Sequence, residues 1–110
     1  MIDWKRVAEL RDEIGAEDFG DVVDLFLDEV ESEISELRKG CPQDQLESKL
    51  HFLKGSALNL GFRVFSDFCQ TGETATATGA FDRIDLPKTF NCFDASKAEF
   101  IKGLEALDDG

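Results

Sequence analysis

The sequence has few of the residues that build metal centres, disulfide frameworks or membrane spans. Its 110 residues include one histidine and three cysteines, and Cys41, Cys69 and Cys92 are far apart with no C-x-x-C spacing. This odd number and spacing argue against a zinc site and a disulfide framework, so packing is their expected role. No apolar run approaches the roughly 20 residues of a membrane span, and the start of the chain lacks the apolar core of a signal peptide. We therefore expect a cytoplasmic protein.

Basic residues are also scarce. Twelve lysines and arginines stand against 24 aspartates and glutamates, which gives a formal net charge of -12. Nucleic acids and anionic membranes would repel such a surface, so this charge disfavours them, and neither is an expected partner. The only net-positive segment, 38–63, carries five basic and two acidic residues and contains the only histidine, His51. A basic field there would favour an added phosphate, although Arg38 and Lys39 would equally complement a helix C-terminus and Lys49 would equally be solvated.

The length and the apolar pattern predict one all-helical domain over residues 1–110. An apolar fraction of 42% with ten phenylalanines is enough for one core, and neither strand alternation nor an internal repeat is present. The threonine-rich stretch 71–78 contains poor helix formers, which leaves its helical order open. Apolar spacings of three and four predict helices over 4–14, 18–39, 43–60 and 63–78, and a last helix that starts near 85–87 and whose apolar pattern reaches Leu107.

Four of these helices are long enough to pack side by side, and their connections are short. This pattern indicates an all-α fold, an up-down-up-down four-helix bundle with a short additional N-terminal helix across one end. Asp3 is the expected N-cap of the short helix, and Gly15 and Gly40 are expected to end the first two helices.

The helix predicted over 43–60 has one apolar face and places His51 away from it. Lys54 and Gly55 follow His51 by three and four residues, so all three lie on neighbouring surface. A mid-helix glycine costs about 1 kcal/mol relative to alanine, which indicates a demand for close approach, and the lysine ammonium suits a phosphoryl group. The trio therefore predicts a docking place for phosphate. The apolar face consists of Leu46, Leu50, Leu53, Ala57 and Leu60.

The motif H-x-x-K-G-x-x-x-x-x-G is present in full, as His51, Lys54, Gly55 and Gly61. With it, the chain resembles the histidine phosphotransfer (Hpt) domain family of bacterial and plant phosphorelays, which has the four-helix architecture. The resemblance implies that His51 accepts a phosphoryl group on Nε2 from the aspartyl phosphate of a receiver domain and passes it to another receiver domain. It further implies that Lys54 steadies the phosphoryl group and that Gly55 lets the loops of the receiver domain approach.

Other residues near His51 are candidates for supporting roles. Glu47 lies one helical turn before His51 and is a candidate to hold one ring nitrogen and fix the tautomer, although an ordinary exposed glutamate is the alternative. Leu58 lies on the same stripe as His51, and Phe52 and Phe62 lie near enough to join it in an apolar docking surface. The alternative for Leu58 and Phe62 is that they cover the edge of the core.

The chain contains no G-x-x-x-x-G-K-[ST] loop, no glycine-rich nucleotide lid and no second histidine. We therefore expect neither ATP binding nor autophosphorylation, and no autonomous kinase or ATPase activity. No cofactor of its own is expected, and the resemblance implies that magnesium resides in the partner receiver domain. The expected partners are response-regulator receiver domains and a hybrid sensor kinase, and the domain is expected to be a monomer.

Rival interpretations are a non-catalytic adaptor and a metal bundle. An adaptor would be a helical bundle that binds a receiver or another signalling protein, and intact His51 and Lys54 count against it. A ferritin-like metal bundle needs Glu-x-x-His pairs, but Ser48 stands three residues before His51. The methionine at position 1 favours a free-standing phosphotransfer protein over a fragment cut from a larger kinase.

Overall fold

A computed structural model of the chain describes residues 1–109, with the side chains of residues 1–106. Within this part the chain is all-helical, and its only strand-like pairing is an isolated antiparallel bridge between Ile2 and Phe62. Leu107, which the apolar pattern of the last helix includes, lies outside the described side chains. The elements are α1 (Trp4–Ile14), α2 (Ala16–Lys39), α3 (Gln43–Leu60), α4 (Arg63–Ala77), the 3-10 helix η1 (Phe81–Arg83) and α5 (Leu86–Asp109).

The predicted helix boundaries are confirmed to within two residues, because local signals set most of them. The carboxylate of Asp3 accepts a hydrogen bond from the Arg6 amide at 3.3 Å, which caps α1 as expected. The carboxylate of Asp85 accepts from the Lys88 amide at 3.0 Å and caps α5 in the same way. Gly15 and Gly40 both have positive φ angles and follow α1 and α2. The largest difference is that α2 begins at Ala16, two residues before the predicted start.

The threonine-rich second half of α4 is helical to Ala77. Its threonine hydroxyls donate to the helix's own carbonyls, as Thr76 does to Glu73 at 2.7 Å and Thr78 to Thr74 at 3.2 Å. Gly72, Ala75 and Thr76 are buried, so tertiary packing overrides the low helix propensity of this stretch.

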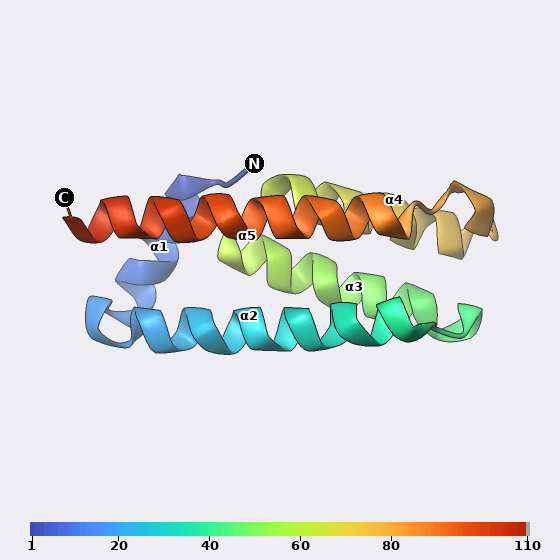
Figure 1. The fold of residues 1–110 in the computed structure, drawn as a ribbon, viewed down its shortest axis with the longest axis horizontal. Coiled ribbons are helices and arrows are strands. Elements are labelled where there is room, and N and C mark those ends of the chain that lie inside the picture. Colours follow the sequence, from blue (N-terminus) through green and yellow to red (C-terminus); the bar gives the residue numbers. More distant parts are fainter. Residues whose placement is uncertain (110) are drawn as a thin grey trace.

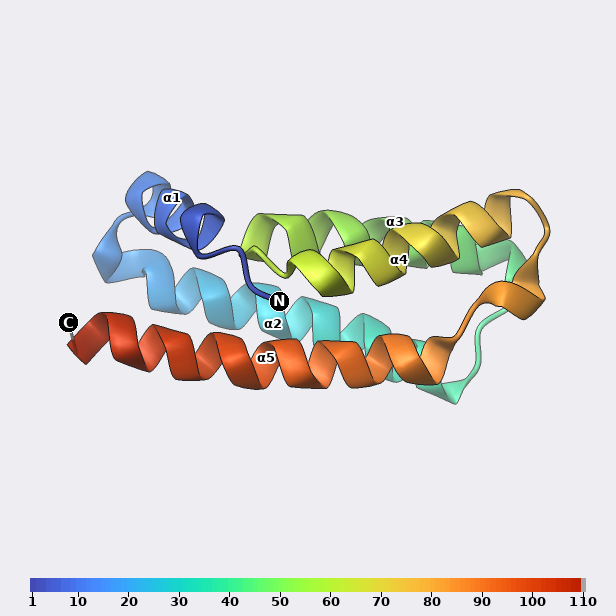
Figure 2. The same cartoon turned by 90° about the horizontal axis from the view of Figure 1, so that it is seen from above.

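The four long helices lie side by side along the long axis of the molecule, which measures 46 × 21 × 20 Å (Figure 1). Seen from above, α1 lies at one end, near the turn that joins α3 to α4 (Figure 2). The residues before α1 are tied to that turn, because the Asp3 amide donates to the Gly61 carbonyl at 2.7 Å and the Arg63 amide to the Met1 carbonyl at 3.1 Å. The N-terminal segment therefore fixes the turn that follows the histidine helix.

The core runs between the four long helices and is rich in phenylalanine. The ring of Phe62 lies 5.1 Å from that of Phe100 and 6.0 Å from that of Phe93, measured between centroids. Trp4 of α1 stacks on Phe100 at 6.0 Å, which joins the short helix to the bundle. The four leucines and the alanine of the predicted apolar face of α3 are all buried, so this prediction is confirmed.

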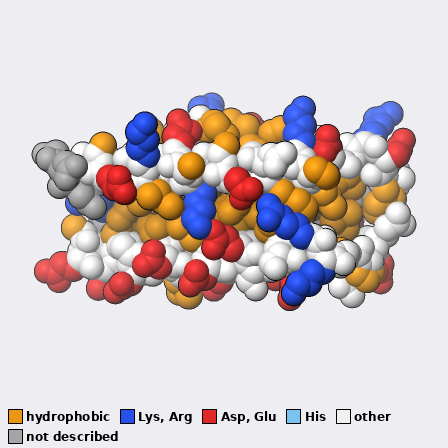
Figure 3. Space-filling view, in the orientation of Figure 1, with side chains coloured by type: hydrophobic (Ala, Val, Ile, Leu, Met, Phe, Trp, Pro, Cys, Tyr) orange, Lys and Arg blue, Asp and Glu red, His pale blue; other side chains and the backbone are white. Residues whose placement is uncertain are grey.

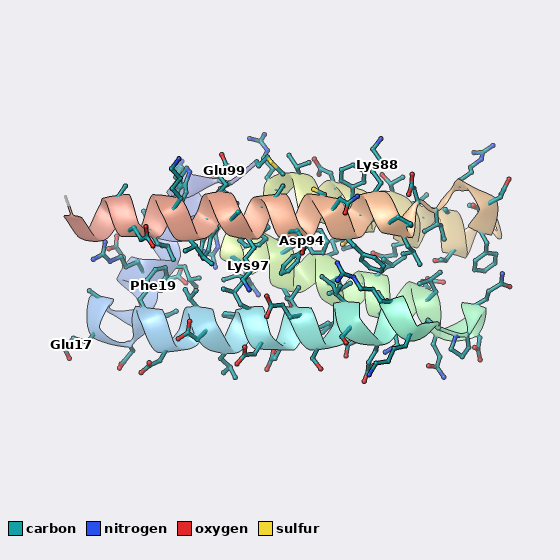
Figure 4. The ribbon with its side chains drawn as sticks, viewed as in Figure 1. Glu17, Phe19, Lys88, Asp94, Lys97 and Glu99 are labelled. Atoms are coloured by element: carbon teal, nitrogen blue, oxygen red, sulfur yellow. The ribbon has the colours of Figure 1, made fainter. Side chains whose placement is uncertain are left out.

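The face between α2 and α5 shows hydrophobic side chains with basic side chains lying across them (Figure 3). Two ion pairs join the helices there: Lys97 pairs with Glu31, and Arg38 with Asp94 at 3.4 Å. Figure 4 labels Lys97 and Asp94, the two members of these pairs that belong to α5. The Arg38 guanidinium also lies 5.1 Å from the centre of the Phe90 ring. Within the described residues, no helix is long and apolar enough to cross a membrane.

Candidate functional site

His51 lies in the middle of α3, on the side away from the buried leucine face, and its side chain is 68% exposed. Gly55, one turn later, is exposed, and a Cβ placed there would meet nothing within 4 Å beyond its own helix. Two large apolar side chains of the same helix are also open to solvent, Leu58 at 54% and Phe52 at 40% exposure. An accessible imidazole is thus bordered by open backbone and exposed apolar surface.

The ring of His51 is held by a residue of the neighbouring helix. Its Nδ1 lies 2.9 Å from Oε1 of Glu73 on α4. The other carboxylate oxygen of Glu73 forms an ion pair with Nζ of Lys54 at 2.8 Å, and this ammonium donates a hydrogen bond to Gln70 Oε1 at 3.0 Å. Gln70 in turn donates to the Thr74 hydroxyl at 3.0 Å. His51 and Lys54 of the motif therefore meet through one carboxylate.

The charge of Glu73 determines which ring nitrogen of His51 carries a proton. Lys54 holds the pKa of the Glu73 carboxyl below its usual range, and the contact with His51 acts in the same direction against the opposing effect of burial. Glu73 is therefore ionised at neutral pH, and an ionised carboxylate only accepts hydrogen bonds. Nδ1 must then be the donor, which leaves Nε2 as the unprotonated nitrogen of the neutral imidazole.

For Glu47 and Phe62 the structure agrees with the alternative that the sequence left open, and not with the candidate role at the site. Nδ1 of His51 contacts Glu73 and not Glu47, which is exposed one turn earlier on α3. Phe62 is only 1% exposed and packs against Phe93 and Phe100, so it belongs to the core and not to a docking surface. The alternative interpretation of Phe62 as a core residue is correct, because the chain turns inward after α3 ends.

The predicted basic field around His51 is largely neutralised. Lys49 binds Glu33 at 3.1 Å and Glu36 at 2.9 Å on the α2 side of the helix, and these contacts raise the pKa of Lys49, with Glu36 the first cause. Lys54 is paired with Glu73. Three of the five basic residues of this segment, Arg38, Lys49 and Lys54, therefore form ion pairs that connect helices.

Glu73 and Gln70 are not predicted as site residues from the sequence, because they are distant along the chain from His51 and Lys54. A signal for them exists in the antiparallel arrangement of α3 and α4 about Phe62. His51 lies eleven residues before Phe62 and Glu73 lies eleven residues after it. Likewise, Lys54 lies eight residues before Phe62 and Gln70 eight residues after it. Residues placed symmetrically about such a turn come opposite one another when both face the partner helix.

The described acidic, cysteine and histidine side chains are not grouped in the way that a metal centre requires. In the part of the chain that the structure describes, no group of three histidine, cysteine, aspartate or glutamate side chains is placed to hold a metal ion. The thiol of Cys69 is buried near Cys92, and burial raises its pKa to about 12, so it is an inert packing group at neutral pH.

Comparison with known families identifies the family of the chain. The family model described as the Hpt domain matches residues 21–110, which include α3, α4 and the whole motif. The short helix α1 lies outside the matched range. No curated protein and no solved structure matches the chain. The match covers most of the 110 residues, and the chain therefore belongs to the Hpt domain family, which indicates histidine phosphotransfer in two-component phosphorelays.

Proposed function

We propose that this protein accepts a phosphoryl group on Nε2 of His51 from a receiver-domain aspartyl phosphate and passes it to another receiver domain. The observation that carries this proposal is the exposed imidazole whose Nδ1 contacts an ionised Glu73 at 2.9 Å. That contact leaves a nucleophilic lone pair on Nε2. The bundle that holds the helix is proposed to have the up-down-up-down order.

The transfer step follows from this tautomer. Nε2 attacks the phosphorus of the aspartyl phosphate, the N–P bond forms as the P–O bond to the aspartate breaks, and the aspartate carboxylate leaves with the electron pair. The ring gains positive charge as the bond forms while Nδ1 keeps its proton. The Glu73 carboxylate, already in place, stabilises that charge without reorganisation.

Lys54 is proposed to steady the phosphoryl group. Its ammonium is tied to α4 through Glu73 and Gln70 and its side chain is 20% exposed, so it is partly ordered before any partner arrives. Developing negative charge on the phosphoryl oxygens would attract this ammonium, which has three donors and a flexible stem. Glu73 would then be left to the positively charged ring.

The receiver domain is proposed to dock on the surface formed by Gly55, Leu58 and Phe52. Open backbone at Gly55 leaves room for a partner loop, and the exposed leucine and phenylalanine supply apolar contact area. The partner would bring the aspartyl phosphate and its magnesium, because the described residues of this chain offer a nucleophile, the carboxylate that holds its ring and a cation, but no group placed to bind a metal ion.

The direct test is transfer of labelled phosphate from a phosphorylated receiver domain. We expect an acid-labile adduct on the wild-type protein and none on His51→Gln. Lys54→Ala should slow transfer at least about tenfold, since a positioned charge is lost. Lys49→Ala is the matched control, because Lys49 lies on the same helix with the same 20% exposure and also forms ion pairs, but toward α2. It should transfer at the wild-type rate.

Two results would overturn the proposal. Label on His51→Gln would mean that another residue accepts the phosphate. Binding of receiver domains with no label on the wild-type protein, across all receivers of the same organism, would instead identify a non-catalytic adaptor.

A further inference from the structure

Gly72 is a glycine in the interior of α4, at a place where the backbone gives no reason for one. Its φ angle is not among the positive ones, and the helix continues for five residues beyond it. Glycine is disfavoured inside helices because it gains backbone freedom on unfolding. A requirement of packing is therefore the remaining reason for its presence at this position.

The space that a side chain at position 72 would need is occupied by Leu50 of α3. A Cβ there would lie 2.9 Å from Cδ1 and 3.6 Å from Cδ2 of Leu50, and 3.8 Å from Cγ2 of Ile84. Leu50 is 1% exposed and belongs to the core, so a change in its rotamer would disturb other packed side chains. Gly72 thus permits the close contact of α3 and α4 at this level.

Leu50 and Gly72 immediately precede the two residues whose side chains are joined by the hydrogen bond at the imidazole. His51 follows Leu50, Glu73 follows Gly72, and the Nδ1 to Oε1 distance is 2.9 Å. Ordinary carbon contacts are about 3.5 Å or longer, so a methyl group at position 72 requires a displacement of about 0.6 Å. The same displacement between the helices would take the hydrogen bond beyond its upper range of about 3.2 Å.

Glu73 has little freedom to follow such a shift. Its side chain is 18% exposed, and its second oxygen is held by Lys54 at 2.8 Å. We propose that Gly72 is a positioning residue: by leaving room for Leu50 it sets the spacing of α3 and α4 at which Glu73 holds Nδ1 of His51. The role of this spacing in transfer depends on the proposed function, whereas its effect on the ring does not.

The test compares three variants by ¹⁵N NMR of the imidazole ring, thermal unfolding and transfer rate. Gly72→Ala should shift the ratio of the two neutral tautomers about tenfold away from the Nδ1–H form, and slow transfer by a similar factor, because a charge-assisted hydrogen bond is weakened. Gly20→Ala is the matched control, because Gly20 also lies inside a helix but has nothing within 4 Å of the added carbon. It should leave the ring and the rate unchanged.

The third variant combines Leu50→Val with Gly72→Ala, which moves one carbon from one helix to the other at constant volume. It should restore the wild-type tautomer. A folded Gly72→Ala variant with the wild-type tautomer would overturn the proposal. In that case the side chain of Leu50 would have moved aside, and the spacing of the two helices would not have changed. If Gly72→Ala does not fold, the double variant decides alone: the wild-type tautomer supports the proposal and an altered one overturns it. Failure of transfer in the wild-type protein would refute the proposed function and leave this NMR test intact.

Discussion

Gly61 occupies a position where a side chain would collide with the N-terminal segment of the chain. It ends α3 with a φ of +79°, in the left-handed region. A Cβ at this position would lie 2.7 Å from the backbone oxygen of Asp3 and 3.1 Å from Cγ2 of Val7. The substitution Gly61→Ala therefore strains the backbone and also pushes the segment before α1 off the turn between α3 and α4.

The cost can be worked out from these contacts. An alanine in the left-handed region costs about 1 kcal/mol relative to glycine. Displacement of the segment breaks the hydrogen bonds from Asp3 to Gly61 at 2.7 Å and from Arg63 to Met1 at 3.1 Å, at about 1 kcal/mol each. The free energy of unfolding should fall by about 3 kcal/mol in total, which for a domain of this size lowers the melting temperature by about 12 °C.

Gly55, the other glycine of the motif, is the internal control. It is helical and a Cβ there would meet nothing within 4 Å. Gly55→Ala should therefore raise the free energy of unfolding by up to about 1 kcal/mol, as alanine does inside an exposed helix. Urea unfolding followed by circular dichroism, with the slope checked for equality between variants, measures both changes.

The two glycines should thus change stability in opposite directions. If Gly61→Ala lost less than about 1 kcal/mol, the N-terminal segment would not be bound to the turn as the structure shows. If Gly55→Ala lost as much as Gly61→Ala, Gly55 would serve the fold, and its assignment to partner docking would lose its basis.

Three other outcomes test the core, the N-terminal helix and the site. Phe62→Ala should cost about 3–5 kcal/mol in urea unfolding and the exposed Phe52→Ala less than about 1; equal losses would contradict the burial of Phe62. Gly103→Ala should shift the fluorescence of the only tryptophan to the red, because its Cβ would overlap the ring of Trp4; an unchanged spectrum would show that the two are not packed. The lowered pKa of Glu73 means that its stabilisation is complete above the ordinary glutamate value of about 4.3 and is lost as the pH falls through the folded-state value. The stability difference between wild type and Glu73→Gln should therefore shrink below pH 4.3, and a constant difference from pH 7 to pH 3 would refute the ion pair.

The helices could be predicted from the sequence because their signals are local. The spacing of leucines in residues 43–60 and the glycine after them give both boundaries of α3 as observed. The sequence leaves the place of Phe62 open, because this residue follows the end of that helix and helical periodicity no longer gives the direction of its side chain. Its burial depends on Phe93 and Phe100, which come from the far end of the chain.

In the site, too, the contact that depends on packing between helices could not be predicted from local sequence patterns. Rules for neighbours on one helix pointed to Glu47, four residues before His51, but the ring is held by Glu73, 22 residues after it. Which acid reaches the ring depends on the register and the spacing of α4 against α3: the register follows from the turn at Gly61, and we assign the spacing to the contact of Leu50 with Gly72. The motif therefore contains the proposed nucleophile and its proposed cation, whereas the group that holds the ring is determined by the packing of two helices. The second glycine of the motif contributes to the chemistry through that packing, since it allows the turn from which the register of α4 begins.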